Sequence, residues 1–281
     1  MSDKLFQEYL HERRTLRELA RDRGRSIKWV QQQIRSYEPE ELEVKPGSIV
    51  FIADATYWGS RKDGFGTLVF LDCTHNLVVA SRHFPGTERK ADYLRLKRRI
   101  LVQGFKIQAV VIDGRKGLRE LFSSYPVQYC QFHQQQRITR YLTLNPKSEA
   151  AIDLKRICSY MTRCTEARFS WLLDAWHGRH QDYLNEKKED DSKRGWHYTH
   201  KRLRSAYFSL RRNTPWLFTY RKYPEFSIPN TTNPLDGGVF APMKNLINLH
   251  AGISKSLKVK MIDDFLVQHN KKNLSASKKF H

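Results

Sequence analysis

The sequence contains few cysteines, no long apolar stretch and comparatively few acidic residues. Its four cysteines, at positions 73, 130, 158 and 164 of 281, show no regular spacing, so we expect a reducing cytoplasm and no disulfides. No apolar run approaches the ~20 residues of a membrane span. Residues 1–14 contain no apolar signal-peptide core. These absences predict a cytoplasmic protein without a membrane partner.

The shortage of acid is the strongest compositional signal. Lys and Arg number 50 against 29 Asp and Glu, which gives a formal net charge of +21. Such an excess predicts a polyanionic partner, DNA or RNA, although charge alone does not separate the two. Aromatic residues occur within basic stretches at 198–207 and 216–223, where they are candidates for stacking on bases or for ordinary core packing.

Residues 14–37 predict two short helices with a tight break. Thr15 with Glu18 fits a capping box, Gly24 interrupts the pattern, and Ser26 is placed to cap the second helix. Apolar side chains then recur at helical spacing and are expected to face inward: Ile27, Val30 and Ile34.

This pair of helices resembles a helix-turn-helix, whose second helix enters the major groove. The outward positions of that helix are candidate phosphate or base contacts: Lys28, Gln31, Gln32 and Arg35. The alternative is a helical hairpin packed on the next domain. A polar segment at about 38–45 is expected to be a linker.

Two apolar strands end in an acid. Residues 49–52 are followed by Asp54, and residues 107–112 by Asp113. An ionised carboxylate at the end of a buried strand is costly to desolvate unless it is paired or binds a metal. For Asp113 alone, a solvated turn is the favoured interpretation. Two neighbouring strands that each deliver one carboxylate favour a divalent-metal site.

The order of the elements predicts an α/β fold. Strands are expected at 48–55, 67–72, 77–83, 107–112 and 127–130, with helices at 88–102 and 117–122. This β-β-β-α-β-α-β order implies a mixed, partly parallel sheet covered on both faces, with sites at the carboxyl ends of its strands.

The second half of the chain is expected to be mainly helical. Residues 131–215 show three apolar stripes, interrupted by an exposed charged loop at 186–195. A helix is expected from Pro234 to about residue 250, and an amphipathic segment covers 257–269. Residues 271–281 are basic and are expected to be disordered.

Four motifs together resemble a known family. They are Asp54 within IADAT (52–56), Asp113 within VIDGRKGL (111–118), the YCQFH segment (129–133) and the TTNPLDGG segment (231–238). These match the two strand-end acids, the Cys-x-x-His signature and the Thr-x-Asn-x-x-Glu segment of mutator-like DDE transposases of bacterial insertion sequences. The resemblance covers about residues 47–260 and implies a ribonuclease H-like catalytic domain.

The resemblance implies five regions. They are a helix-turn-helix region with its linker (1–45), the first part of the catalytic domain (46–133), an all-helical insertion (134–228), the final catalytic helices (229–270) and a basic tail (271–281).

The resemblance also implies a magnesium-dependent DNA transposase. The catalytic and metal-binding residues would be Asp54, Asp113 and Asp236, holding two Mg²⁺ ions for which Mn²⁺ can substitute. The enzyme would cleave the ends of its element and join the 3′-hydroxyls to target DNA. Cys130 and His133 would form a structural motif beside the site.

The implied partners are double-stranded DNA with terminal inverted repeats, and target DNA. Further DNA contacts are expected from Arg115, Lys116 and Asn233, although Asn233 and Thr232 are equally candidates to cap the helix of the third acid. Pairing two element ends implies a homodimer or larger assembly on DNA. The location would be the bacterial cytoplasm, at the nucleoid.

The sequence departs from the family pattern at two places. Asp236 stands where the family usually has Glu, and no cysteine-rich zinc ribbon precedes Leu16, as in a short or truncated copy. Two alternatives therefore stay open: a ribonuclease H-like nuclease or resolvase, and a catalytically weakened, element-derived DNA-binding protein.

Other residues are secondary candidates for the metal. Reserve acids are Asp72, Glu225, Asp263 and Asp264, of which the last two are expected on a solvated helix face. Cys130 and His133 supply half of a tetrahedral zinc site, which Cys158 and Cys164 would have to complete. The sequence favours a structural role for Cys130 and His133 over zinc binding.

Overall fold

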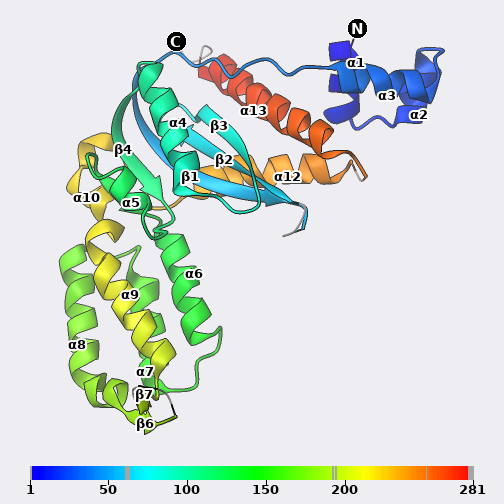
Figure 1. Cartoon of the computed structure of the whole chain (residues 1–281). Coiled ribbons are helices and arrows are strands. Elements are labelled where there is room, and N and C mark those ends of the chain that lie inside the picture. The colour runs from blue at the N-terminus through cyan, green and yellow to red at the C-terminus, as the bar shows by residue number, and fades with distance from the viewer. Residues whose placement is uncertain (1, 61–63, 192, 194, 251, 278–281) are drawn as a thin grey trace. The chain divides into compact units, whose positions relative to one another are not determined.

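The computed structural model describes residues 2–60, 64–191, 193, 195–250 and 252–277 (Figure 1). It is a mixed α/β structure with a five-stranded sheet of order β3-β2-β1-β4-β5. The strands are β1 (Ser48–Trp58), β2 (Phe65–Asp72), β3 (Leu77–Pro85), β4 (Lys106–Ile112) and β5 (Val127–Tyr129). β2 and β3 are antiparallel, whereas β4 runs parallel to both β1 and β5.

The chain divides into two units, and the boundary falls within β1. The first unit comprises Met1–Gly47, Asp54–Phe105 and Asn233–His281, and the second comprises Ser48–Ala53 and Lys106–Thr232. Asp54 and Asp236 therefore belong to the first unit. Asp113, Cys130 and His133 belong to the second.

The strands form at the apolar runs. In β1 the five residues from Ile49 to Ala53 are each at most 2% exposed, and every residue of β2 is buried. A strand with both faces covered has a continuous apolar sequence in place of an alternating one. Each of the five strands expected from the sequence overlaps an observed strand.

The first unit begins with three helices: α1 (Ser2–Leu10), α2 (Leu16–Asp22) and α3 (Ile27–Ser36). The Thr15–Glu18 capping box and the Ser26 cap are confirmed. Gly24 joins α2 to α3 with φ +58°, a left-handed conformation that suits glycine. The expectation that Ile27 faces inward is wrong. It is 41% exposed, because it opens the helix one turn before the buried Val30.

The first unit also contains α4 (Lys90–Val102), α11 (Asn233–Leu235), the π-helical turn η2 (Asp236–Phe240), α12 (Ala241–Asn248) and α13 (Lys255–Ser277). Asn270 of α13 fixes this helix to β3, since its side chain exchanges two 2.8 Å hydrogen bonds with the backbone of Val78. The helix expected to begin near Pro234 consists of three consecutive segments: α11, the π turn η2 and α12.

The second unit follows its strands with helices: α5 (Leu118–Leu121), α6 (Gln131–Leu142), α7 (Glu149–Tyr160), α8 (Glu166–Asn185), α9 (Lys201–Leu217), α10 (Thr219–Lys222) and the 3₁₀ turn η1 (Pro224–Phe226). Buried polar side chains join α6 to α9. Gln134 donates to Ser209 and accepts from Asn213, at 3.1 and 3.0 Å. Gln131 donates to the carbonyl of Leu217 at 2.8 Å.

Two expectations about irregular segments are corrected. The charged stretch 186–195 is not a simple loop, because its residues contribute to a small antiparallel hairpin of β6 (Lys187–Glu189) and β7 (Trp196–Tyr198). Residues 271–277 are not disordered, because they continue α13, whereas 278–281 lie outside the described residues. No helix of the described residues is long and apolar enough to cross a membrane.

Candidate active site

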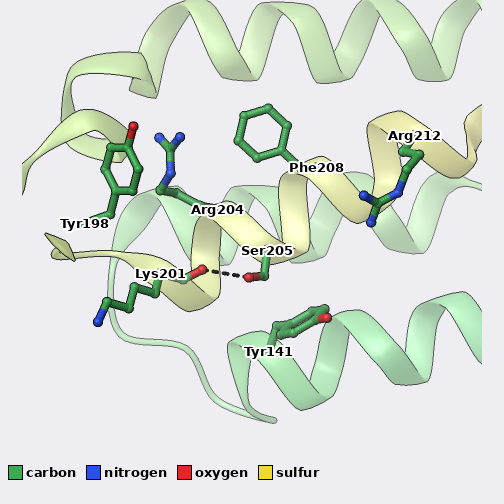
Figure 2. Close-up of a pocket in the computed structure, with 7 residues that line it drawn as sticks. All are labelled: Tyr141, Tyr198, Lys201, Arg204, Ser205, Phe208 and Arg212. Carbon is green, nitrogen blue, oxygen red and sulfur yellow. Dashed lines mark hydrogen bonds between the residues drawn. The ribbon is translucent and has the colours of Figure 1, made fainter. Parts of the chain in front are cut away.

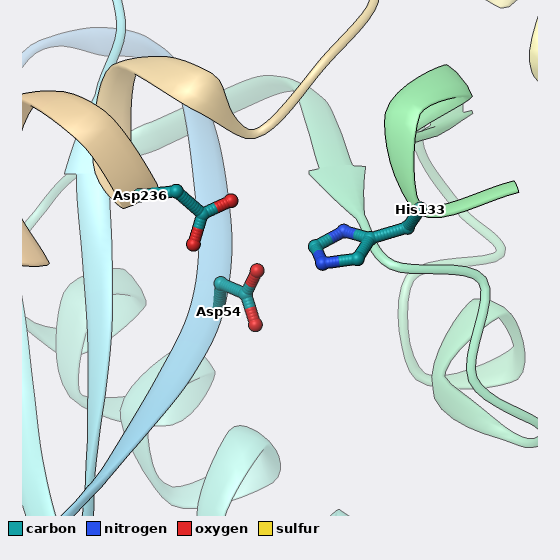
Figure 3. A group of neighbouring side chains, drawn as sticks. All are labelled: Asp54, His133 and Asp236. Carbon is teal, nitrogen blue, oxygen red and sulfur yellow. The ribbon is translucent and has the colours of Figure 1, made fainter. Parts of the chain in front are cut away.

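Two of the predicted acids meet within the first unit. Asp54 extends from β1 and Asp236 from the π turn η2, and their carboxylate oxygens lie within 4.8 Å of each other. Figure 3 shows the two carboxyl groups side by side, one from the strand and one from the helical turn. Both residues are half-buried. One oxygen of Asp54 accepts a 2.7 Å hydrogen bond from the backbone N–H of Ala55, which orients that carboxylate.

The π turn determines how Asp236 is presented. Its wide turn is closed by the N–H of Ala241, which donates to the carbonyl of Asp236. Such turns are rare and occur often at functional sites. A Cβ on Gly237 would lie 3.1 Å from Oδ1 of Asn233, whereas one on Gly238 would meet nothing within 4 Å. Gly237 therefore leaves room for Asn233 beside the acid.

An open pocket of about 280 Å³ lies beside Asp236. Thr56 and Tyr57 of β1 line one part, and Phe240 and Lys244 line another. Lys244 is half-buried and supplies the only positive charge of the lining, all of which belongs to described residues. The pocket thus combines a carboxylate, an ammonium and an exposed aromatic ring.

Asp113 follows β4 in the second unit and is held by its own turn. Its Oδ1 accepts a 2.8 Å hydrogen bond from the backbone N–H of Arg115. Gly114 has φ +74°, and a Cβ there would lie 3.1 Å from the ring of Tyr129, so only glycine fits without strain. The guanidinium of Arg137 reaches the carbonyls of Asp113 and Gly114 at 3.4–3.5 Å.

The Cys-x-x-His motif forms the start of α6. The Cys130 sulfur accepts from the backbone N–H of His133 at 3.4 Å and from that of Thr232 at 3.3 Å. The Thr232 hydroxyl lies 3.4 Å from the same sulfur and 3.3 Å from Nδ1 of His133. Burial raises the pKa of the Cys130 thiol, but the hydrogen bonds from His133 and Thr232 outweigh it, and the pKa falls below its usual value.

Thr232 directly precedes α11, the short helix before Asp236. It is fully buried, and its hydroxyl is directed to Cys130 and His133. Asn230 strengthens this junction, because its carbonyl accepts from the N–H of Gln131 at 2.9 Å. The motif joins the start of α6 to the segment that leads to Asp236.

The four candidate zinc ligands do not assemble among the described residues. Cys130, His133, Cys158 and Cys164 form no common metal-binding group there, and all four cysteines are free thiols. Burial raises the pKa of the Cys158 thiol to about 12.

The reserve acids have other roles. Asp72 is buried and bonds to His75 and to the N–H of Thr74 at 2.6 and 3.1 Å. Asp263 bonds to His83 at 2.9 Å. The expectation of a solvated face is wrong for Asp264, which is 1% exposed because the N-terminal helices cover it. Glu225 is exposed in η1.

Most of the predicted DNA contacts are accessible. Lys28, Gln32, Arg35, Lys116 and Asn233 are exposed, and Arg115 is half-buried.

The outward position expected for Gln31 is correct only in part. Gln31 is half-buried, because it lines a pocket of about 240 Å³ that α1 and the segment before α13 also border.

Three features of these sites could not be recognised from the sequence motifs. Lys244 gives no motif signal, the π turn breaks the 3.6-residue period used to recognise helices, and the Thr232–Cys130 contact joins residues 102 positions apart. The run of two glycines after Asp236 was the available sign of an irregular turn.

No protein-family model matches the chain, and no curated protein matches it. Among solved structures, it is similar to a chain of the simian T-cell lymphotropic virus intasome in complex with PP2A regulatory subunit B56 gamma. That match has 8% identity, covers 73% of this chain and 68% of the other, and has a TM-score of 0.25. A match to the Drosophila P element transposase strand transfer complex has 11% identity, covers 100% and 80%, and has a TM-score of 0.36. Both TM-scores are too low to establish a common fold.

Proposed function

We propose that this protein is a DNA transposase that cleaves the ends of a mobile element and joins them to target DNA by metal-assisted phosphoryl transfer. The observation that carries the proposal is the meeting of Asp54 and Asp236, whose oxygens lie within 4.8 Å although they are far apart in sequence. Two carboxylates this close repel one another unless a cation or proton lies between them. Oxygen ligands of this kind suit Mg²⁺ or Mn²⁺.

Strand register supports Asp113 as a member of the acid triad alongside Asp54. β1 and β4 are parallel, and Ile52 pairs with Val111. Asp54 and Asp113 each lie two residues beyond that pair, and side chains two residues apart on a strand share a face. We therefore assign both to one face at the carboxyl end of the sheet, the position where open α/β sheets place their sites.

His133 is a further candidate ligand. It lies in the first turn of α6, directly after β5, and Tyr129 of β5 pairs with Ile112 beside Asp113. Its Nδ1 contacts the Thr232 hydroxyl, so Nε2 is the nitrogen assigned to a metal. We propose that His133 supplies a nitrogen ligand to a divalent ion.

Bound Mg²⁺ would lower the pKa of a water or 3′-hydroxyl and neutralise charge on the leaving oxygen. The chain contributes rigid positions for its ligands, with Asp54 fixed by the strand and the N–H of Ala55. Lys244, which lines the pocket beside Asp236, is placed to bind a phosphate of the reacting strand and orient it for in-line attack. The ribonuclease H-like fold and the mutator-like family belong to this same proposal. The β-β-β-α-β-α-β order and the four motifs support it.

The test uses supercoiled plasmid carrying matched terminal repeats from the DNA that flanks the coding region, incubated with Mg²⁺. We expect paired end cleavage followed by strand transfer. Asp54→Asn and Asp236→Asn should each lower the cleavage rate by about 10²–10⁴-fold, because each replaces a negatively charged carboxylate ligand, worth several kcal/mol, by a neutral amide, while DNA binding is kept. Glu225→Gln, an exposed acid, is the matched control and should cleave normally.

Three outcomes would contradict the proposal. Normal cleavage by Asp236→Asn would remove the third acid. Nicking directed by DNA structure, without end pairing, would indicate a resolvase-like nuclease. Binding to the repeats without cleavage by the wild-type protein would indicate an element-derived DNA-binding protein.

A further inference from the structure

Helix α9 exposes a row of basic residues and one large aromatic ring along a single face. Lys201, Arg204, Phe208 and Arg212 follow one another at intervals of three, four and four residues, which places them on one side of the helix. Phe208 is 44% exposed, although a phenylalanine on a helix normally faces the core. The row extends over roughly 16 Å, from the 1.5 Å rise per residue.

These four side chains line a pocket with two tyrosines, Tyr141 of α6 and Tyr198 of β7 (Figure 2). We call it the α9 groove. Its volume is about 370 Å³, and all of its lining lies within the second unit. Among the described residues that line it, none is acidic. The groove thus offers flat rings and positive charge side by side.

Arg204 holds the rings of the α9 groove in place. Its guanidinium lies 3.6 Å from the ring centre of Tyr198 and 5.3 Å from that of Phe208. The same group donates to the carbonyl of Leu184 and the side-chain oxygen of Asn185, both at 2.9 Å. Because the guanidinium of Arg204 is already held by these contacts, little side-chain entropy would be lost when a ligand binds there.

The charge of the groove is available to a ligand. Helix α9 contains five basic residues and no acidic one: Lys201, Arg202, Arg204, Arg211 and Arg212. Arg211, outside the groove, is paired with Asp174 at 3.0 Å. Within the part of the chain that the structure describes, neither Lys201 nor Arg212 has an ion-pair partner.

We propose that the α9 groove binds a single-stranded segment of DNA, with phosphates on Lys201 and Arg212 and a base stacked on Phe208. Basic grooves with exposed aromatic rings are the usual platform for unpaired strands, since every base has a face that can stack. In a duplex the base faces are covered by neighbouring base pairs, so a duplex would contact only the basic side chains of the groove through its phosphates. This site is separate from the catalytic acids. Only the choice of DNA as the bound polymer rests on the proposed function.

Strand cleavage and transfer generate unpaired DNA beside the reacting ends. A second binding surface for such a strand, carried by the helical region, would retain it between the two steps. Because the α9 groove lies wholly in the second unit, its contacts do not depend on how Asp54 and Asp236 are arranged.

The test measures fluorescence anisotropy of a labelled 20-nucleotide oligo(dT), a 20-bp duplex and an oligo(U) RNA in EDTA, where no cleavage occurs. Phe208→Leu should weaken oligo(dT) binding roughly 5- to 150-fold, the range for losing one stacked base. Duplex binding should change by less than about 2-fold, because paired bases do not reach the ring. Phe208→Tyr keeps the ring and should bind oligo(dT) as the wild type does.

A charge variant tests the phosphate contacts independently of the ring. Lys201→Gln with Arg212→Gln should reduce the slope of log K against log salt for oligo(dT) by about 1.4, from 0.7 per phosphate contact. Arg98→Gln with Arg99→Gln removes two exposed charges from α4 and should leave that slope unchanged. Trp171→Leu is the aromatic control, since Trp171 is 54% exposed beneath Arg168 but lies outside the groove.

Several results would overturn the assignment. One is unchanged oligo(dT) affinity in Phe208→Leu, and another is an equal loss of duplex affinity in that variant. A third is an equal loss of oligo(dT) affinity in Trp171→Leu. The fourth is an oligo(U) affinity more than about 10-fold higher than the oligo(dT) affinity. Circular dichroism melting identifies any variant that fails to fold. If Phe208→Leu fails to fold, the salt slope of the Lys201→Gln, Arg212→Gln variant decides the test. A wild type that binds oligo(dT) through the groove but never cleaves would refute only the proposed function. A cleaving enzyme whose groove variants bind normally would refute only the groove.

Discussion

At the scale of single residues, Thr232 connects two motifs that look independent in the sequence. Its hydroxyl contacts both the Cys130 sulfur and Nδ1 of His133. A hydroxyl at Nδ1 orients the imidazole and fixes which nitrogen faces outward, as partners of metal-binding histidines commonly do. The Thr-x-Asn segment is thus suited to position His133. Its Thr232 lies four residues before Asp236 in the sequence.

The role of His133 can be tested with Mn²⁺ as the probe. Titration followed by electron paramagnetic resonance should show His133→Ala binding Mn²⁺ at least 10-fold more weakly than wild type, because a ligand nitrogen is lost. Thr232→Val, which removes only the orienting hydroxyl, should cause a smaller loss in the same direction. Phe132→Ala, an exposed neighbour, is the control. Unchanged Mn²⁺ affinity in His133→Ala would leave the histidine a purely structural role.

At the scale of elements, α13 holds the N-terminal helices through one buried carboxylate. Asp264 accepts hydrogen bonds from Gln7 at 2.9 Å and from the Tyr37 hydroxyl at 2.5 Å, and it pairs with His11 at 2.9 Å. Burial raises the pKa of Asp264, but these three partners outweigh it, and the pKa lies below its usual 3.8. Lys260 adds a second attachment through the carbonyls of Arg35 and Tyr37.

The depressed pKa gives a stability prediction with a defined sign. Because the folded-state pKa of Asp264 lies below the unfolded value of 3.8, its contribution is complete well above pH 3.8 and is lost as the pH falls through the folded value. At pH 7, Asp264→Asn should cost roughly 2–4 kcal/mol, because buried donors lose a charged acceptor. Urea unfolding at pH 7, 5 and 3.5 should show a constant difference from wild type down to pH 5 and a smaller one at pH 3.5.

Asp263→Asn is the matched control for this comparison. Asp263 is adjacent in sequence but half-buried and bonded only to His83 among the partners described here, so its replacement should cost less than that of Asp264. If Asp264→Asn is equally destabilising at pH 3.5 and pH 7, the loss comes from packing and the carboxylate charge is not what holds the N-terminal helices.

The elements differ in how far the sequence could predict them. Strands β1 and β4 were predictable because strands covered on both faces are unbroken apolar runs, and the caps at Thr15 and Ser26 because they depend on residues three apart. The partners of Asp264 could not be predicted, because Gln7 lies 257 residues away in the sequence and no local sequence pattern indicates such a contact. The polar end of α13 and the short hairpin of β6 and β7 lack the apolar spacing on which the predictions relied.

At the scale of the candidate site, the sequence singled out the acids but not the residues around them. Asp54 and Asp113 were recognisable because an acid at the end of an apolar strand needs a physical reason. Asp236 was recognisable only through the motif resemblance, since its π turn has no regular period. Lys244 and Thr232 acquire meaning only from packing, which brings together segments that are distant in the chain.

At the scale of the whole molecule, the positive charge is distributed unevenly. Residues 1–47 contain 10 Lys and Arg against 9 Asp and Glu, a net of +1, although they carry the helix-turn-helix-like segment. The rest of the chain therefore supplies a net of +20 out of +21. Charge of this size governs non-specific DNA affinity. Under the proposed function, this distribution predicts that the N-terminal helices select the DNA sequence and that the rest of the chain supplies affinity.

This division predicts different effects on affinity and selectivity. Gln32→Ala with Lys28→Gln alters two exposed side chains of α3 and removes one positive charge. Binding to a duplex of random sequence should change little, with a salt slope lower by about 0.9. Selection from a randomised duplex pool should lose the preferred motif that wild type enriches, because a lost base contact costs roughly 1–3 kcal/mol. Arg98→Gln with Arg99→Gln should keep the motif. If the α3 variant loses random-duplex binding as severely as enrichment, the N-terminal helices supply affinity as well, and the inferred division fails.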